Sequence, residues 1–116
     1  MPLLTIRTNI ALDHSAKIRI STLLSRGTAE LLGKAEHFVM VMLDTSVALT
    51  FGGSDDPAAF VELKSIELPE DLTKHYAAVL CDLIEQQLEV PADRVYVELT
   101  NASRSMWGWN RTTFER

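Results

Sequence analysis

The chain has 116 residues, of which 47% are hydrophobic, and a net charge of −5 from 11 Lys and Arg against 16 Asp and Glu. This hydrophobic content argues against a disordered chain. The negative net charge argues against a protein that binds the phosphate backbone of nucleic acids through clustered positive charge. The longest uninterrupted apolar run, Phe38–Leu43, is too short to cross a bilayer, and the N-terminus lacks a secretory signal pattern. We therefore expect one globular domain over residues 1–116, located in the cytoplasm, with neither nucleic acid nor membrane as a partner.

The chain opens with Met1-Pro2 at the head of a strand-like run, 3–8, in which apolar and polar residues alternate. Pro2 has two interpretations. It can simply start a strand, where proline is tolerated. Alternatively, because a small second residue permits removal of Met1, Pro2 can carry a free secondary amine. An ordinary α-amino group has a pKa of about 7.7–8.0. Apolar surroundings lower the pKa of a terminal amine, which would make Pro2 a base for moving protons near neutral pH.

A helix is predicted next, because apolar or small residues recur at helical spacing at Ile20, Leu23, Leu24, Gly27 and Leu31. Asp13 or Ser15 can cap its start, and Gly33 can end it. The apolar run Phe38–Leu43 is then predicted to form a strand. Gly and Pro residues in Phe51–Pro57 indicate a turn after it.

The pattern then repeats at an offset of 57 residues. Residues 60–65 alternate as 3–8 do, and 95–100 are matched to 38–43. Between them a second helix is predicted, starting at Pro69 and ending before Pro91, with apolar positions at Ala77, Leu80, Cys81, Ile84 and Leu88. The predicted fold class is therefore α+β, a pseudo-twofold β-α-β repeat whose two helices pack on one face of a mixed four-stranded sheet.

One face of this sheet is predicted to meet the helices, through Val61, Leu63, Val95, Val97 and Leu99. The opposite face carries mostly polar residues. Because Phe38–Leu43 is apolar on both of its faces, we expect another subunit to cover the open side of the sheet.

The tail 105–114 carries both tryptophans and lies outside the repeat. Such an appended aromatic segment is expected to cover a subunit edge or to close a pocket. Cys81 is the only cysteine, so no disulfide within the chain is possible, and the histidines have no ligand spacing, so no metal site is expected.

Together these features resemble the macrophage migration inhibitory factor family of the tautomerase superfamily. The matching segments follow the family's order over nearly the whole chain: Met1-Pro2, Thr8-Asn9, Gly33-Lys34, Phe51-Gly52-Gly53-Ser54, Ser65-Ile66, Asp93-Arg94-Val95-Tyr96 and Gly108-Trp109-Asn110 with Thr113-Phe114. The resemblance implies a homotrimer with active sites between subunits. It also implies keto–enol tautomerisation of phenylpyruvate-type acids, that is, 2-oxo acids with an aromatic side chain, with dopachrome isomerisation as a laboratory activity and no cofactor.

The resemblance also assigns roles to residues. Pro2 would be the catalytic amine that takes the α-proton and returns it to the other end of the enol system. The substrate carboxylate would meet Lys34 and the backbone N–H of Ile66. Tyr96 of a neighbouring subunit would lie beside Pro2, and apolar walls would come from Phe38, Trp109 and Phe114.

Two residues depart from the family pattern. Glu98 stands where the mammalian proteins have an asparagine close to the pocket, and a carboxylate there would raise the pKa of the Pro2 amine. Trp107 replaces a small aliphatic residue beside the pocket and would narrow it. Glu98 leaves open a related enzyme in which it and Pro2 act on an unsaturated acid, although the arginine pair of such enzymes has no clear counterpart in the sequence. A further alternative is a trimeric cytokine-like or interaction protein whose tautomerase pocket is weak or vestigial.

Overall fold

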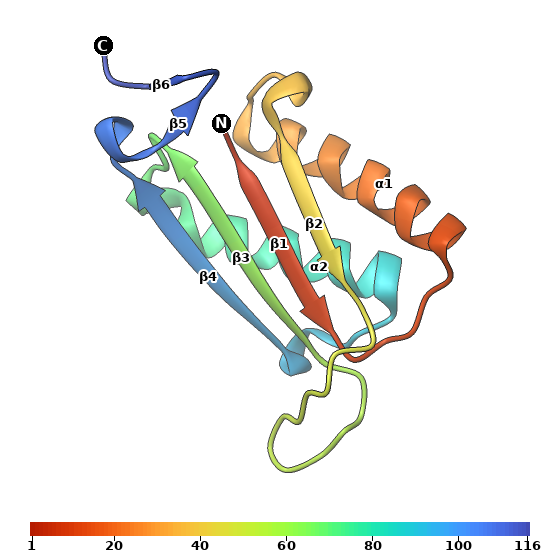
Figure 1. The fold of residues 1–116 in the computed structure, drawn as a ribbon. Helices are drawn as coiled ribbons and strands as arrows, with labels where there is room; N and C mark the ends of the chain where they lie inside the picture. Colours follow the sequence, from red (N-terminus) through yellow and green to blue (C-terminus); the bar gives the residue numbers. More distant parts are fainter.

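The computed structural model describes residues 1–116 as two helices packed on one face of a four-stranded sheet (Figure 1). The main elements are β1 (Leu3–Thr8), α1 (His14–Leu32), β2 (Met40–Asp44), β3 (Ala59–Ile66), α2 (Thr73–Leu88) and β4 (Val95–Ala102). The strand order is β2-β1-β3-β4, in which the central pair is antiparallel and both outer pairs are parallel. The predicted α+β fold with a mixed sheet is confirmed.

The core lies between the sheet and the two helices. The central strands contribute Leu4, Ile6, Val61 and Leu63, and the helices contribute Ile20, Leu24, Leu80, Ile84 and Leu88. Each fully buried aliphatic side chain of this kind stabilises the fold by about 1.5–3 kcal/mol. The predicted helix-facing side of the sheet is confirmed, since Val95 is also buried and Val97 and Leu99 pack against the same cluster. Neither helix is long and apolar enough to cross a membrane.

Both predicted caps of α1 are present. The Asp13 side chain accepts a hydrogen bond from the Ala16 amide at 2.8 Å, which satisfies one of the free N–H groups of the first turn. Gly33 ends the helix with a φ of 62°, a left-handed conformation that costs glycine little. The amide of the next residue, Lys34, donates to the Ala29 carbonyl at 3.0 Å. This closing turn fixes the direction in which the chain leaves α1.

The second helix starts later than predicted. Pro69 precedes a single 3-10 turn, Glu70–Leu72, and α2 begins at Thr73. The Leu72 amide donates to the Pro69 carbonyl, which is the i to i+3 hydrogen bond of a 3-10 turn. The residues predicted to form the first turn of the α-helix form this 3-10 turn instead.

The strand predicted over Phe38–Leu43 is also displaced. Glu36–Phe38 forms a 3-10 turn, and β2 begins at Met40, whose amide donates to the Pro2 carbonyl at 3.0 Å. Phe38 therefore lies outside the sheet. Its side chain lines a cavity near the start of β1 instead.

The sequence repeat holds for β1, β3 and both helices but shifts by one residue in the last strand. Leu3 pairs with Met40, whereas its counterpart Phe60 pairs with Tyr96 rather than with Val97. The predicted match of 38–43 to 95–100 is therefore wrong by one position. Burial agrees with the new register, because Met40 and Tyr96 are both exposed while Val41 and Val97 are both half-buried. In a strand, a shift of one residue exchanges the two faces.

The loop between β2 and β3 is held by two polar side chains. Asn9 donates to the carbonyls of Asp55 and Asp56 at 3.0 Å, and its side-chain oxygen accepts from the Ala58 amide. The Arg94 guanidinium donates to four backbone carbonyls of the same loop, those of Phe51, Ser54, Asp56 and Pro57. Asn9 and Arg94, from two of the segments that carry the family resemblance, therefore have a structural role in this loop.

Candidate functional site

The site lies where the start of β1 meets the C-terminal tail (Figure 1). The tail forms a small hairpin of β5 (Gly108–Trp109) and β6 (Thr112–Thr113), joined by Asn110 and Arg111, which both have positive φ. Two consecutive residues of positive φ make a turn whose twist suits a tight hairpin. The hairpin thereby brings Trp107 and Trp109 next to the first residues of the chain.

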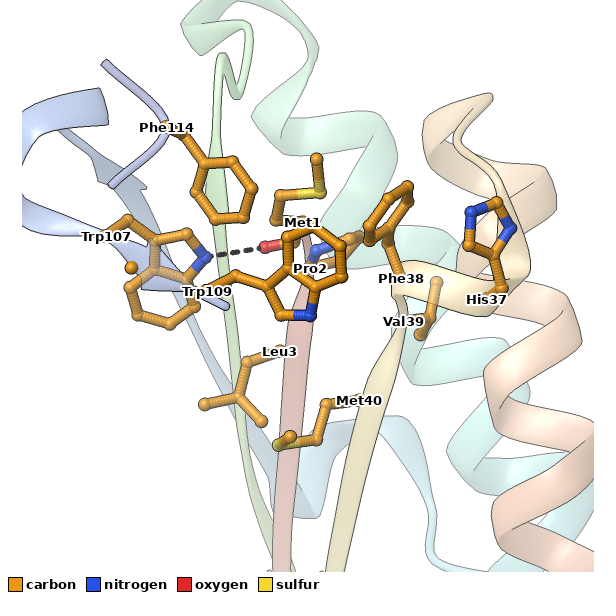
Figure 2. Close-up of a pocket in the computed structure, with 11 residues that line it drawn as sticks. Met1, Pro2, Leu3, His37, Phe38, Val39, Met40, Trp107, Trp109 and Phe114 are labelled. Atoms are coloured by element: carbon orange, nitrogen blue, oxygen red, sulfur yellow. Dashed lines mark hydrogen bonds between the residues drawn. The ribbon is translucent and has the colours of Figure 1, made fainter. Parts of the chain in front are cut away.

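An apolar cavity of about 350 Å³ opens between the tail and β1 (Figure 2). Pro2 lies in its wall and is almost completely buried. The other lining residues are Met1, Leu3, His37, Phe38, Val39, Met40, Trp107, Gly108, Trp109 and Phe114. The expectation that the tail closes a pocket is confirmed within the chain.

Aromatic rings define the shape of this cavity. Phe38 meets Trp109 edge-to-face at a centroid distance of 5.2 Å, and Trp109 stacks nearly parallel to Phe114 at 6.5 Å. The Trp107 indole N–H donates to the Met1 carbonyl at 3.0 Å, as the dashed line in Figure 2 shows. Rings arranged in this way offer an apolar slot that an aromatic ligand can enter.

A second cavity, of about 420 Å³, shares Met1 and Phe38 with the first and is strongly charged. Its remaining lining residues are Lys34, Ala35, Ile66, Glu67, Arg104 and Arg116. The chain start therefore lies at the border between an aromatic cavity and a cationic one.

Lys34 leaves α1 through the Gly33 turn and reaches across to the end of β3. Its Nζ donates to the Ile66 carbonyl at 2.8 Å and to the Ser65 hydroxyl at 3.2 Å. Burial lowers the pKa of Lys34 from its ordinary value, opposed by the Glu67 charge and reinforced by Arg104. The ammonium group is thus held in place by uncharged acceptors, so its charge is available to an anion.

Glu67 follows β3 in a left-handed conformation, with a φ of 53°. Its Oε1 accepts hydrogen bonds from Nε and Nη2 of Arg104 and, at 3.4 Å, from Nη2 of Arg116. The hydrogen bond from Arg104 is the main reason that the pKa of Glu67 lies below its ordinary value.

The electrostatic surroundings of the chain start disfavour positive charge. The pKa of the Met1 α-amino group is lowered from its ordinary value, first by burial, then by Lys34 and to a smaller degree by Arg104, while Glu67 acts in the opposite direction. An amine at this position is therefore biased toward its basic, unprotonated form. The Pro2 nitrogen itself is an amide while Met1 is attached and becomes an amine once Met1 is removed.

Seven of the nine residues singled out in the sequence come together around the two cavities. Pro2, Phe38, Trp107, Trp109 and Phe114 line the aromatic one, and Lys34 and Ile66 line the cationic one. Tyr96 and Glu98 do not join them within the chain. Both are exposed on the open face of the sheet, where Tyr96 packs against Phe51 at 5.0 Å. Nowhere do three or more His, Cys, Asp or Glu side chains gather in a way that could hold a metal ion.

Apart from Lys34, sequence reasoning missed the charged residues of the site. Glu67, Arg104 and Arg116 lie far apart along the chain and have no recognisable spacing. The only hint was the position of Arg104 directly before the aromatic tail, which becomes informative once the tail is known to fold back onto the chain start.

Comparison with known proteins gives a consistent result over the whole chain. The sequence model described as Macrophage migration inhibitory factor (MIF) matches residues 1–115. The macrophage migration inhibitory factor homolog of Trichinella spiralis is 36% identical over 116 residues, covering 98% of this chain and 100% of that protein. The macrophage migration inhibitory factor of Xenopus laevis is 34% identical, with coverage of 98% and 99%. The crystal structure of the homologue from Prochlorococcus marinus superposes with a TM-score of 0.89 at 38% identity, covering 97% of this chain and 99% of that one.

Proposed function

The chain belongs to the macrophage migration inhibitory factor family of the tautomerase superfamily, and on that premise we propose that it is a cofactor-independent keto–enol tautomerase. In this proposal the substrate is a 2-oxo acid with an aromatic side chain, as in phenylpyruvate and dopachrome tautomerases. The catalyst is the secondary amine of Pro2 after removal of Met1. Family membership supports isomerase chemistry in general, and the identity of the base and of the substrate class is our proposal.

The observation that carries the proposal is the position of Pro2 in the aromatic cavity, directly after Met1, which borders both cavities. A substrate carboxylate directed toward Lys34 leaves its aromatic ring on the side of Phe38, Trp109 and Phe114. The carbon between these two groups then faces the Pro2 nitrogen. Fixing both ends of a substrate in this way positions the reacting atoms next to the base.

The reaction moves one proton and no other atom. The unprotonated Pro2 amine removes a proton from the carbon next to the ketone, and the electron pair of that C–H bond forms the C=C bond of the enol. The carbonyl oxygen takes up the proton that the ammonium form of Pro2 returns. Lys34 stabilises the negative charge on the carboxylate, and burial of Pro2 keeps competing water away.

The active unit in this proposal is a homotrimer, and its site is completed by a neighbouring subunit. Tyr96 lies exposed on the open face of the sheet, and Glu98 lies on the same face two residues further along β4. Both are exposed and so accessible to another copy of the chain. We assign Tyr96 of the neighbour to the wall beside Pro2 and Glu98 to the rim.

The test is a phenylpyruvate tautomerase assay on protein whose intact mass shows that Met1 has been removed. Replacing Pro2 by Gly should lower kcat/KM by about 10²- to 10⁴-fold, the usual contribution of a positioned acid–base group. Protein that retains Met1, by the same mass criterion, should be equally inactive because its Pro2 nitrogen is an amide. Circular dichroism and oligomeric mass serve as controls that the variant folds and assembles normally.

Equal activity in Pro2→Gly and the processed wild type would refute the role of the proline's secondary amine, and equal activity in protein that retains Met1 would refute any role of an amine at residue 2. An inactive processed wild type that binds a protein partner saturably would instead favour the cytokine-like alternative. Turnover of a haloacrylate that is lost in Glu98→Gln would favour the enzyme acting on unsaturated acids.

A further inference from the structure

The cationic cavity holds more positive charge than the proposed reaction uses. Three cationic side chains, Lys34, Arg104 and Arg116, line it together with a single carboxylate, that of Glu67. The proposed function assigns a task only to Lys34. The geometry of Arg104 and Glu67 indicates what these two residues do.

Arg104 lines the cationic cavity and is hydrogen-bonded to a residue of the aromatic one. Its Nη1 donates to the Phe114 carbonyl at 2.9 Å, and the Phe114 side chain lines the aromatic cavity. The other edge of the guanidinium, Nε and Nη2, points at Glu67. This fork of two N–H groups matches the two oxygens of a carboxylate, a ligand that arginine binds in bidentate geometry.

The Glu67 carboxylate accepts the hydrogen bonds of this pair of N–H groups, and the Glu67 backbone is strained. Its positive φ is uncommon for a residue other than glycine, and strain of this kind collects at functional sites. All of its contacts with Arg104 and Arg116 go through one oxygen, Oε1, and its side chain is 55% exposed. An exposed ion pair is weak because water and salt compete with it. A second carboxylate can therefore replace Glu67 at small energetic cost.

We propose that Arg104 is a second carboxylate-binding residue of the site and that Glu67 is an internal counter-ion, which occupies Arg104 until an anionic substrate displaces it. This inference rests on the proposed function for the nature of the substrate. Glu67 thus competes with the substrate for Arg104, and its loss tightens binding, whereas loss of Arg104 weakens it.

The binding test uses benzoylformate, a 2-oxo acid with an aromatic ring and no hydrogen on the carbon next to the ketone. It cannot enolise, so its dissociation constant is independent of any catalysis. In titration calorimetry on processed protein, Arg104→Gln should weaken binding about 3- to 10-fold, and Glu67→Gln should tighten it about threefold. Arg26→Gln, on the exposed face of α1 and outside both cavities, removes the same charge and should leave the constant within about twofold.

The double variant distinguishes competition between Glu67 and the ligand for Arg104 from a general effect of net charge on binding. If Glu67 occupies Arg104, the effect of Arg104→Gln should be larger in the Glu67→Gln background than in the wild type, because the competitor is gone. Arg104→Gln also removes the contact with Phe114 and could loosen the tail. The tightening expected of Glu67→Gln leaves that contact intact and tests the inference independently.

The outcomes distinguish this inference from the proposed function. Binding that responds to Arg104 and Glu67 in a protein without tautomerase activity would uphold the inference and refute the proposed function. Tautomerase activity that depends on Pro2, together with benzoylformate binding unchanged in all three variants, would overturn the inference alone. In the active enzyme, Arg104→Gln should raise KM for phenylpyruvate more than it lowers kcat, as expected for a residue that holds the substrate.

Discussion

At the start of the chain, burial and nearby charges set the basicity of the terminal amine. Burial, Lys34 and Arg104 lower the pKa of the amine at the chain start, and Glu67 raises it. In the proposed function, loss of Met1 leaves the Pro2 amine in the same surroundings. Each nearby charge should therefore shift the pH at which catalysis begins.

Lys34→Met tests this effect. Removing a positive charge favours the ammonium form and raises the pKa of the amine, so the acidic limb of the kcat/KM profile should move to higher pH. KM for phenylpyruvate should also rise by roughly tenfold, since a charged hydrogen-bond donor to the carboxylate is lost. The measurement is a set of pH–rate profiles.

The matched control is Lys74→Met on the exposed surface of α2, which removes the same charge away from both cavities. Its profile should coincide with that of the wild type. An unshifted acidic limb in Lys34→Met would show that this lysine does not influence the proton-accepting group.

The sequence singled out the main aromatic residues of the first cavity together with Lys34 and Ile66 of the cationic one, but not Glu67, Arg104 and Arg116. Pro2 and Trp109 belong to segments whose order along the chain resembles a family. Glu67, by contrast, reaches Arg104 only through a left-handed backbone and a separation of 37 residues. Local patterns carry no information about a pair that forms only when the tail folds back.

At the scale of elements, the end of α1 connects the fold to the site. Gly33 has a positive φ, and a Cβ added there would meet nothing within 4 Å. The cost of Gly33→Ala is therefore conformational alone, and we expect about 1 kcal/mol of lost stability in urea unfolding. Because the same turn directs Lys34 into its cavity, the variant should also raise KM for phenylpyruvate.

Gly33→Asn provides the comparison, since asparagine tolerates the left-handed region better than alanine. Its stability should lie between those of the wild type and Gly33→Ala. If both variants were as stable as the wild type, the left-handed turn would not limit the stability of the helix end.

Element types were predicted correctly, but boundaries and one register were not. Hydrophobic periodicity fixes which face of an element is buried, so both helices and all four sheet strands were found. The strand at 38–43 was placed too early because Phe38 is as apolar as the strand residues after it, although it lies in a 3-10 turn. The shifted register of β4 depends on the pairing with β3, which periodicity alone does not reveal.

For the whole molecule, the open face of the sheet points to assembly. The side chains of Met40, Met42 and Tyr96 are all at least half exposed on this face, although they are large and hydrophobic. Such a surface is typical of a contact between subunits.

Met42→Arg places a charge in this face and should dissociate the proposed homotrimer, of three times the 13.0 kDa chain mass, into monomers, as measured by light scattering after size-exclusion chromatography. Tautomerase activity should fall with it, because the proposed site includes Tyr96 of a neighbour. The control is Ile18→Arg, which changes an equally exposed apolar residue on α1 and should leave the mass unchanged. A trimeric Met42→Arg protein would place the interface elsewhere.

The pseudo-twofold repeat has a consequence for stoichiometry. The counterpart of Pro2 in the second half is Ala59, which is 4% exposed and lies inside the chain at the start of β3. Because Ala59 is an internal residue, its nitrogen is a peptide nitrogen and is not basic, whatever its surroundings. The two halves are therefore alike in architecture and unequal in chemistry. A reagent that consumes the proline amine should saturate at one equivalent per polypeptide, although the framework around that amine is built twice.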